Sequence, residues 1–411
     1  MTYHLKNAHL YQNGMFAEGN YFLSDGVLFS SFDGVVSITI ENAYIFPGFA
    51  DVHVHLREPG FSYKETIASG CAAGARGGYV NLCAMPNLSP VPDRVEHLRA
   101  QQSIIQRDGS IHVHPYGALT VGEGGRKLSD ISGLAEHVIA FSDDGKGVQS
   151  APLMEEAMKA VAACGKILCA HCEDEGLLNG GYIHDGAYAR QHGHRGIPSE
   201  AEWRQVERDL QLAQKTGCRY HVCHVSTKES VELIRRAKAD GVDVTCETAP
   251  HYLLLSEQDL KEEGRFKMNP PLRAPADRQA LIAGIADGTI DMIATDHAPH
   301  TPQDKQNGAP GCVGLETAFS VCYTKLCKQH GMPLSRLSRM LSRTPAQIMG
   351  LNKGLLQPGF DGDVVLAAPE EEYTVNPDEF AGKSHNTPYA GLRLAGRVKV
   401  TVKQGVLTYQ M

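Results

Sequence analysis

The 411-residue sequence lacks the features that mark several classes of protein. Nowhere do about 18 apolar residues follow one another, as a membrane-spanning helix requires, and residues 1–20 contain no continuous apolar stretch like that of a secretion signal. Lysine and arginine form no run, and the net charge is −8, so we expect no nucleic-acid partner. These absences predict a soluble, cytoplasmic protein that binds neither a membrane nor nucleic acid.

Two further patterns are absent, a disulfide framework and a phosphate-binding loop. The 11 cysteines are odd in number and lie scattered through apolar segments, which indicates reduced, buried thiols. Cys169 and Cys172 have the spacing of a redox pair, but on a strand they face opposite sides, so we expect no redox function. The glycine-rich stretch at residues 121–125 does not match a phosphate-binding loop. We interpret it as a turn.

The central part of the sequence is a long alternation of apolar, strand-like segments with helical ones. The predicted strands are 45–55, 78–85, 111–119, 138–144, 167–173, 219–226, 243–249 and 291–297. The predicted helices between them are 63–76, 94–107, 152–164, 200–215, 228–239 and 277–286. Eight strands alternating with helices predict an α/β fold, a (β/α)8 barrel of the TIM type. Two more helices are expected after the last strand, at 315–329 and 334–349.

The two ends of the chain differ from this central part. Both have the short apolar runs and turn residues that are typical of β-strands. Because these β-rich ends bracket the barrel, the simplest packing joins them beside it. The sequence therefore predicts a small β-sandwich domain, formed by residues 1–46 together with 354–411, and a barrel domain formed by residues 47–353.

Polar residues gather where the predicted barrel strands end. Asp51, His53 and His55 alternate with apolar residues at period two, so on a strand all three point to one face. Other candidates follow later strands: Asp143, Asp144, His171, Glu173, His221, His224, Asp296, His297 and His300. Active sites of such barrels lie at the carboxyl ends of the strands. Four histidines and two carboxylates meeting there would suit two borderline-soft cations, of which zinc is the expected one.

The sequence resembles the dihydroorotases, a group of cyclic amidohydrolases that includes free-standing bacterial enzymes. Residues 51–60, Asp-Val-His-Val-His-Leu-Arg-Glu-Pro-Gly, are similar to the first signature of the family, and residues 294–300, Ala-Thr-Asp-His-Ala-Pro-His, to its second. Further matching segments follow in order at 85–87, 141–145, 170–173, 221–227 and 267–273. The resemblance implies a metal-dependent hydrolase that reversibly cyclises N-carbamoyl-L-aspartate to L-dihydroorotate in de novo pyrimidine biosynthesis.

The resemblance implies two zinc ions per chain. The implied ligands are His53, His55 and Asp296 for one ion, His171 and His224 for the other, and Asp144 as the bridge. Many relatives bridge their metals with a carboxylated lysine, which the fourth predicted strand lacks, since Lys146 lies beyond its end. Parity along the sixth strand allows only one of His221 and His224 to face the metals, and the resemblance points to His224.

The resemblance also implies how the substrate is bound and processed. Asp296 would act as general base and acid. The implied substrate-binding residues are Arg57, Asn87, Asn269 and His300. Arg57 offers a planar fork of donors that suits a carboxylate. The stretch 301–314 is rich in proline and glycine, so we expect a loop that lies over the site.

Two alternative functions remain open. A hydantoinase or allantoinase would act on a related cyclic amide, but Arg57 and Asn87 argue against it, because those rings carry no carboxylate at the equivalent place. The second alternative is an inactive homologue that serves as a subunit of aspartate transcarbamoylase, an association seen in this family, although all six ligand candidates are present. The sequence also leaves open a homodimer and a need for aspartate transcarbamoylase as partner.

Overall fold

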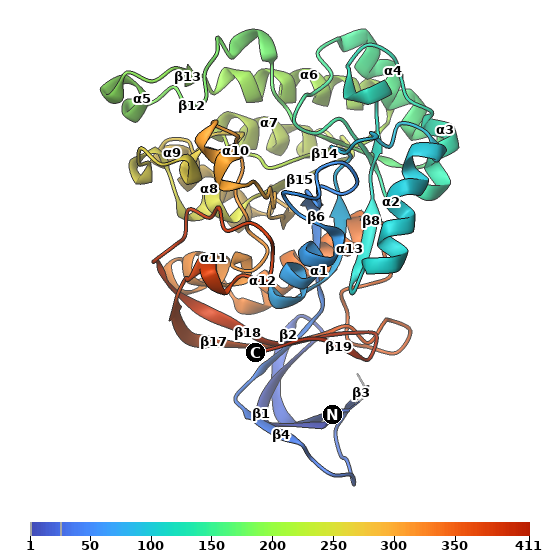
Figure 1. Ribbon diagram of the computed structural model, residues 1–411, viewed down its shortest axis with the longest axis vertical. Coiled ribbons are helices and arrows are strands. Elements are labelled where there is room, and N and C mark those ends of the chain that lie inside the picture. Colours follow the sequence, from blue (N-terminus) through green and yellow to red (C-terminus); the bar gives the residue numbers. More distant parts are fainter. Residues whose placement is uncertain (1, 25–26) are drawn as a thin grey trace.

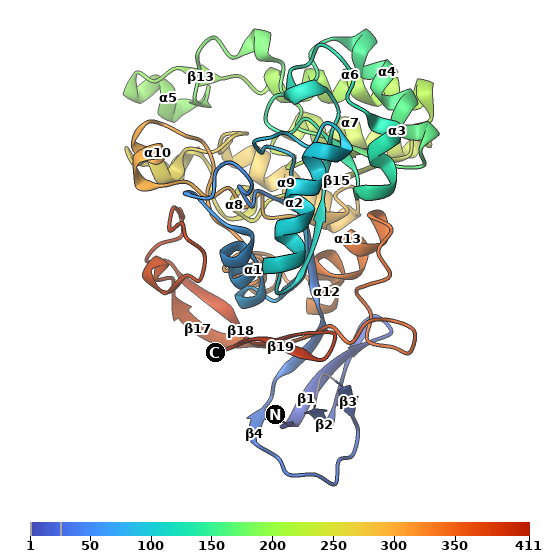
Figure 2. The same cartoon turned by 45° about the vertical axis from the view of Figure 1, so that its right-hand side comes forward.

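The structure, a computed structural model, describes residues 2–24 and 27–411. Met1 and residues 25–26 fall in the predicted N-terminal β region and lie outside the described residues. The predicted (β/α)8 barrel is confirmed, and a separate sheet built from both ends of the chain lies at one end of the molecule (Figures 1 and 2). Among the described residues, no helix is both long enough and apolar enough to cross a membrane.

The barrel strands follow one another around the barrel in chain order. They are β6 (Phe49–Val54), β7 (Tyr79–Ala84), β8 (His112–Pro115), β9 (Gly117–Ala118), β10 (Phe141–Ser142), β11 (Ile167–Ala170), β14 (Arg219–Val222), β15 (Val244–Thr248) and β16 (Met292–Ile293). β8 and β9 share the third position, separated by Tyr116. The ladders between neighbouring strands are parallel. The barrel closes through a bridge between Val54 and His297.

The six helices predicted between the strands are present. They are α1 (Ile67–Arg76), α2 (Val95–Asp108), α4 (Ala151–Ala163), α6 (Glu200–Thr216), α7 (Lys228–Ala239) and α9 (Pro275–Asp287). α1 begins at Ile67 rather than at residue 63, because Thr66 and Ser69 form a capping box in which each side chain accepts the other's backbone N–H. Shorter helices that the sequence did not predict are α3 (Ile131–Leu134), α5 (Ala187–His192), α8 (Pro250–Leu254) and α10 (Pro302–Gln306). A small sheet of β12 (Ile183–His184) and β13 (Gly196–Ile197) flanks α5.

The two helices predicted after the eighth strand are each divided. The first consists of α11 (Ala318–Cys322) and the π-helix η6 (Tyr323–Gln329), and the second of α12 (Leu334–Leu341) and α13 (Arg343–Ile348). The break in the second falls at Ser342, whose φ of −128° is not helical. A continuous apolar periodicity in the sequence therefore concealed the break at Ser342.

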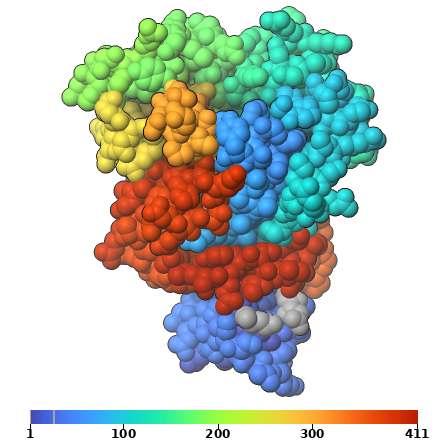
Figure 3. Space-filling view, in the orientation of Figure 1, coloured from blue at the N-terminus to red at the C-terminus, as the bar shows by residue number. Residues whose placement is uncertain are grey.

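Both ends of the chain meet in one sheet. Its strands are β1 (Thr2–Gln12), β2 (Met15–Ser24), β3 (Val27–Phe29), β4 (Ile38–Glu41), β5 (Tyr44–Pro47), β17 (Val364–Thr374), β18 (Arg393–Lys403) and β19 (Val406–Gln410). The order β19-β18-β17-β5-β1-β2-β3 places the C-terminal strands against the N-terminal ones, with β17 antiparallel to β5. In Figure 3 the red C-terminal strands form a band between the barrel and the blue N-terminal strands. The predicted joining of the two ends is confirmed.

The inside of the barrel is filled with apolar side chains. Val52, Cys83, Tyr116, Ile167 and Met292 belong to one buried cluster contributed by different strands. The Tyr116 hydroxyl donates a hydrogen bond to the backbone carbonyl of Val52 (2.9 Å), so the polar end of this buried ring is satisfied. All 11 cysteines lie in the described residues, and none is in a disulfide. The barrel is thus a packed core rather than an open channel.

An aromatic cluster joins the barrel to the sheet of the chain ends. The ring of Phe319, from α11, lies 5.4 Å from that of Phe46 on β5 and 5.7 Å from that of Phe49 on β6, measured between centroids. All three side chains are buried. These contacts hold the start of the first barrel strand against the sheet that precedes it.

Replacing Phe319 by alanine is expected to lower the free energy of unfolding by about 3–5 kcal/mol, because the lost ring leaves a cavity at this junction. Chemical denaturation measures the effect. Phe29→Ala is the matched control, since Phe29 is exposed at the end of β3. An equal loss of unfolding free energy in both variants would show that the aromatic cluster does not stabilise the junction between barrel and sheet.

Candidate metal centre

The structure brings the six predicted ligand residues together at the carboxyl ends of the barrel strands. His53 lies on β6 and His55 just after it, and the other four follow β10, β11, β14 and β16: Asp144, His171, His224 and Asp296. All six side chains are buried. Because parallel strands of a barrel end at one rim, residues that lie far apart in the sequence converge there.

Asp144 lies at the centre of this cluster. Its Oδ1 is 3.3 Å from Nε2 of His53 and 3.6 Å from Nε2 of His224, and its Oδ2 is 3.4 Å from Nε2 of His55. Nδ1 of His171 lies 3.0 Å from Nε2 of His224 and 3.9 Å from Oδ1 of Asp144. One carboxylate therefore faces all four imidazoles.

Asp296 closes the opposite side of the cluster. Its Oδ1 lies 3.2 Å from Nε2 of His55 and 3.6 Å from Nε2 of His53. Two overlapping sets of three potential ligands result, His53 with His55 and Asp296, and His53 with Asp144 and His224, each with its ligand atoms within 4.8 Å of one another. The two sets have His53 in common, so this cluster offers the donors that a cation site requires.

The donor atoms at the centre fit a metal. Nε2 of His53 and Oδ1 of Asp144 are buried and make no hydrogen bond within the described residues, although they lie 3.3 Å apart. A buried polar atom without a partner is costly. Imidazole nitrogens and carboxylate oxygens are the donors that zinc and related divalent cations accept. A bound cation would satisfy both atoms.

The two aspartates are anionic at neutral pH. Burial opposes ionisation of Asp144, but the positive charge of His53, with the ring of His224 close by, holds its pKa well below the ordinary value. Burial likewise opposes ionisation of Asp296, and a hydrogen bond from His55 with the charge of His53 holds its pKa low. Each is therefore in the form that a cation or a proton acceptor requires.

A carboxylate that the sequence analysis did not single out supports His53 from behind. Oε1 of Glu247, on β15, lies 2.9 Å from Nδ1 of His53, and its Oε2 lies 3.3 Å from Nε2 of His221. Burial favours the neutral acid, but hydrogen bonds from His221 and His53 lower the pKa of Glu247 to about 2. Glu247 thus accepts the Nδ1 proton of His53 and leaves Nε2 free for a cation. A carboxylate in the buried strand 244–248 was the available signal.

The structure separates His221 from His224, as strand parity predicted, but for a different reason. His221 is turned towards Thr245 Oγ1 (2.8 Å) and Glu247, while His224 joins the cluster. His224 lies beyond the end of β14 and has a φ of 33°, so a left-handed backbone directs its side chain. Arg57 and Asp296 share this unusual conformation, with φ of 61° and 47°. Backbone strain of this kind collects at functional sites.

Arg57 and His300 form a cationic corner together with Lys64, which the sequence analysis missed. Arg57 Nε donates to the carbonyl of Pro299 (3.2 Å), and its Nη2 lies 3.3 Å from Nε2 of His300. Lys64 Nζ lies 3.4 Å from Nδ1 of the same ring. Burial and the charges of Arg57 and Lys64 lower the pKa of His300 to about 3, so the ring is neutral between two cations. This corner is suited to an anionic group such as a carboxylate.

The two predicted asparagines lie elsewhere around the mouth. Asn87 Nδ2 donates to the carbonyl of Asp144 (2.7 Å) and to Oε1 of Glu123 (3.1 Å). Asn269 Nδ2 donates to Oε2 of Glu173 (3.3 Å) and lies 3.5 Å from Nε2 of His171. Within the part of the chain that the structure describes, Oδ1 of both asparagines is buried and without a partner. Each therefore has one acceptor available at the mouth.

The glycine-rich stretch 121–125 is more than the turn that the sequence suggested. Its first part forms a 3-10 helix, η1 (Val121–Glu123), and the side chain of Glu123 is buried beside Asn87. Burial, reinforced by the neighbouring charge of Asp143, raises the pKa of Glu123 to about 8. The carboxyl group of Glu123 is therefore protonated at neutral pH and lies at the barrel mouth beside Asn87, a predicted substrate-binding residue.

The predicted loop 301–314 contains α10 and is tied down by Lys305. Lys305 Nζ donates hydrogen bonds to three backbone carbonyls, those of Lys267 (3.0 Å), Ala309 (2.7 Å) and Gly311 (2.7 Å). Burial lowers the pKa of this amine to about 8. The stretch is thus organised around a buried cation.

Comparison with known proteins adds to this geometry. A family model described as dihydro-orotase-like matches residues 43–230. A protein from Fusobacterium nucleatum subsp. nucleatum named dihydroorotase is 45% identical over 98% of this chain and 98% of its own. A protein of that name from Geobacillus thermodenitrificans is 48% identical over 91% of this chain and 89% of its own. The solved L-hydantoinase (dihydropyrimidinase) of Arthrobacter aurescens has a TM-score of 0.84 at 24% identity, covering 98% of this chain and 95% of that one, which shows the fold alone.

Replacing Glu247 by glutamine is expected to weaken metal binding by about ten- to a hundredfold, because the amide no longer fixes the tautomer of His53 as a carboxylate does. Competition with a chromophoric chelator measures the affinity directly. Glu257→Gln is the control, since Glu257 is also a buried glutamate but accepts from the backbone of Tyr188, on α5. Equal affinities in the variant, the control and the parent protein would remove this role from Glu247.

Proposed function

This chain belongs to the dihydroorotase family, and from that premise we propose that it interconverts N-carbamoyl-L-aspartate and L-dihydroorotate at a site that holds two zinc ions. The family is one of metal-dependent cyclic amidohydrolases, and this chain is an enzyme of that class. The observation that supports the assignment best is the buried His/Asp cluster with a cationic corner beside it at one barrel mouth.

We propose that the two ions share Asp144. His53, His55 and Asp296 would hold one ion, and His171 and His224 the other. The short distances between these donors and the unpartnered His53 Nε2 and Asp144 Oδ1 support this division. When bound, the ions supply Lewis acidity that polarises a carbonyl and lowers the pKa of water.

The proposed role of Asp296 is to move the proton. In ring opening, water attacks the ring amide carbon, the bond from carbon to ring nitrogen breaks, and that nitrogen needs a proton. An anionic Asp296 would accept the proton of the water and return it to the nitrogen. Ring closure uses the same carboxylate in reverse and releases water.

The proposed substrate contacts divide between the cationic corner and the asparagines. Arg57 and His300 would hold the substrate carboxylate, and Lys64 adds a second positive charge there. Asn87 is proposed at the same carboxylate, where donating to it requires an exchange of its present bond to Glu123. Asn269 would contact the ring through its free Oδ1.

The alternatives are less well supported. The solved structures named hydantoinase are 17% to 24% identical to this chain and therefore speak for the fold only. An inactive subunit of aspartate transcarbamoylase has no need for six converging ligand side chains, all of which are present and buried. A homodimer and a partnership with the transcarbamoylase are further hypotheses, and the assay below addresses the second.

The purified protein alone is expected to open the ring of dihydroorotate. This activity is expected to disappear when a chelator removes the metal and to return when zinc is added, because attack on an amide depends on the bound ions. Turnover of a hydantoin or allantoin but not of dihydroorotate would replace the proposed substrate. Activity that returns only when aspartate transcarbamoylase is added with the zinc would establish that partner as a requirement.

Arg57→Lys is expected to raise KM for dihydroorotate at least about tenfold, because lysine cannot reproduce the two-pronged contact with a carboxylate. Steady-state kinetics measure the change. Arg204→Lys, at an exposed position on α6, is the matched control. A KM equal to that of the control would refute the contact between Arg57 and the carboxylate.

A further inference from the structure

A segment that lies between two strands of the terminal sheet reaches the barrel mouth. Residues 381–387 belong to the connection between β17 and β18, and we call them the bridging segment. In Figures 1 and 2 this connection, in red, rises from the sheet towards the part of the barrel that carries α10. No step of the proposed reaction uses it.

The bridging segment lies along the seam where the first and last barrel strands meet. Within the described residues, this seam has one bridge, between Val54 and His297, with a hydrogen bond from the His55 N–H to the His297 carbonyl (2.9 Å). β6 and β7, by comparison, form a ladder of several residue pairs. The seam therefore has little backbone pairing of its own, although both proposed substrate loops begin there.

On one side, the bridging segment holds the loop that follows the last barrel strand. Ser384 Oγ donates to the carbonyl of His300 (2.6 Å), and Asn386 Oδ1 accepts the backbone N–H of His300 (3.2 Å). Asn386 Nδ2 donates to the carbonyls of Gly311 (3.1 Å) and Ala298 (3.3 Å). The backbone of His300 is thus fixed at both its N–H and its carbonyl.

On the other side, the bridging segment holds the loop that follows the first barrel strand. The backbone N–H of Lys383 donates to Oε1 of Glu65 (3.2 Å), and its Nζ donates to the carbonyl of Ser62 (2.6 Å). Ser384 Oγ also lies 3.4 Å from the carbonyl of Lys64. One short segment therefore binds the backbones of both loops that supply the cationic corner.

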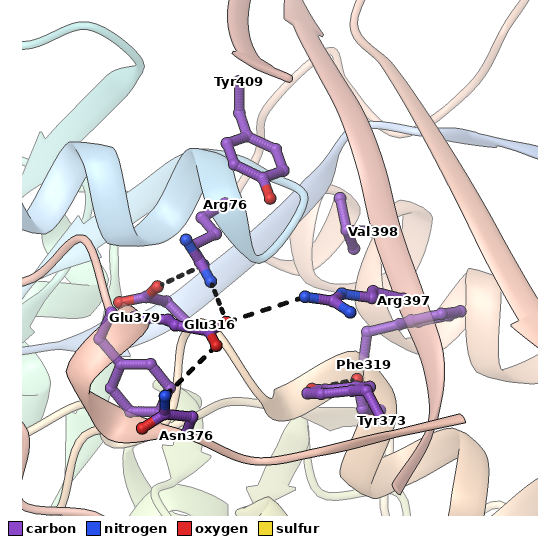
Figure 4. A pocket seen from close by; sticks show the side chains of 11 residues that line it. Arg76, Glu316, Phe319, Tyr373, Asn376, Glu379, Arg397, Val398 and Tyr409 are labelled. Atoms are coloured by element: carbon purple, nitrogen blue, oxygen red, sulfur yellow. Dashed lines mark hydrogen bonds and ion pairs between the residues drawn. The ribbon is translucent and has the colours of Figure 1, made fainter. Parts of the chain in front are cut away.

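The start of the bridging segment is itself anchored to the barrel. Glu316 accepts the backbone N–H groups of Ala381 (3.0 Å) and Gly382 (3.2 Å), and Arg76, at the end of α1, lies 2.9 Å from Glu316. Figure 4 shows this ionic cluster, in which Arg76 also faces Glu379. The segment is thus held at its base and along its length, as a rigid support requires.

We infer that the bridging segment sets the geometry of the cationic corner, with Asn386 and Ser384 as positioning residues that act through His300. The inference rests on the proposed function, in which His300 and Arg57 bind the substrate carboxylate. Asn386 and Ser384 fix the backbone from which the His300 ring extends, so loosening them changes the distance of that ring from Arg57 and Lys64. Within the described residues, no side chain of a proposed metal ligand is hydrogen-bonded to Asn386 or Ser384.

Asn386→Ala is expected to raise KM for dihydroorotate about tenfold, the order that weakening one hydrogen bond to a charged group produces. kcat and the zinc content are expected to stay within about twofold of the parent values, because no proposed ligand contacts Asn386. Asn386→Asp places a carboxylate oxygen against the carbonyls of Gly311 and Ala298, which repel it, so its KM is expected to rise at least as much as that of Asn386→Ala. His385→Ala is the matched control. This side chain belongs to the same segment but is exposed (44%), and its Nδ1 lies 3.8 Å from Oδ1 of Asp378 rather than next to His300.

Two further variants separate the possible failures. If His300→Ala leaves KM unchanged, the proposed role of His300 is wrong and the inference falls with it. If His300→Ala raises KM and Asn386→Ala does not, the inference alone is overturned. Should Asn386→Ala fail to fold, Ser384→Ala, which removes one bond to His300, is expected to raise KM severalfold at unchanged zinc content. An unchanged KM in that variant would equally overturn the inference.

Discussion

The interaction on which the structure depends is the meeting of one buried carboxylate, Asp144, with four imidazoles at the barrel mouth. Such a group is stable only when every charge has a partner, because unpaired charges are expensive to bury. The carboxylate of Glu247 provides such a partner, because it accepts hydrogen bonds from Nδ1 of His53 and Nε2 of His221. Inside the barrel, apolar side chains are packed around Tyr116. The barrel places the ligand residues on five strand ends, and the cation that they share would complete the balance.

The barrel and the positions of its candidate site residues could be predicted from the sequence, because the carboxyl ends of all barrel strands meet at one rim. Each of the eight strands is a short apolar run, and the residue that follows its end reaches the same rim whatever its number. The strand ends therefore gave a set of candidates without knowledge of any contact between them, and the resemblance to the dihydroorotases named the six ligands within that set. His224 shows the limit of the method. Strand alternation separated it from His221 but did not say which of the two joins the cluster, and the backbone at His224, with a φ of 33°, lies beyond the strand end.

The features that escaped prediction depend on contacts between distant parts of the chain. Asn386 bonds to His300 across 86 positions, and although His300 lies in a recognised motif, no local pattern marks Asn386 as its partner. Glu123 was overlooked because glycines around it suggested a turn, whereas its burial comes from Asn87 and Asp143 packing against it. Lys64 lies outside the alternation that drew attention to His53 and His55. Loops that carry specificity are fixed by tertiary contacts, and their geometry cannot be read from periodicity.

The pairing of β17 with β5 has a consequence for how the protein is made. A ribosome releases the chain from its N-terminus, so β5 leaves long before its partner strand β17 exists. The last of the six proposed metal ligands to be synthesised is Asp296. The residues that fix the backbone of His300, Ser384 and Asn386, are synthesised much later. During synthesis the nascent chain can therefore assemble its metal-binding rim first. The cationic corner proposed to bind the substrate carboxylate is completed last, when the C-terminal strands pair with the N-terminal strands of the sheet.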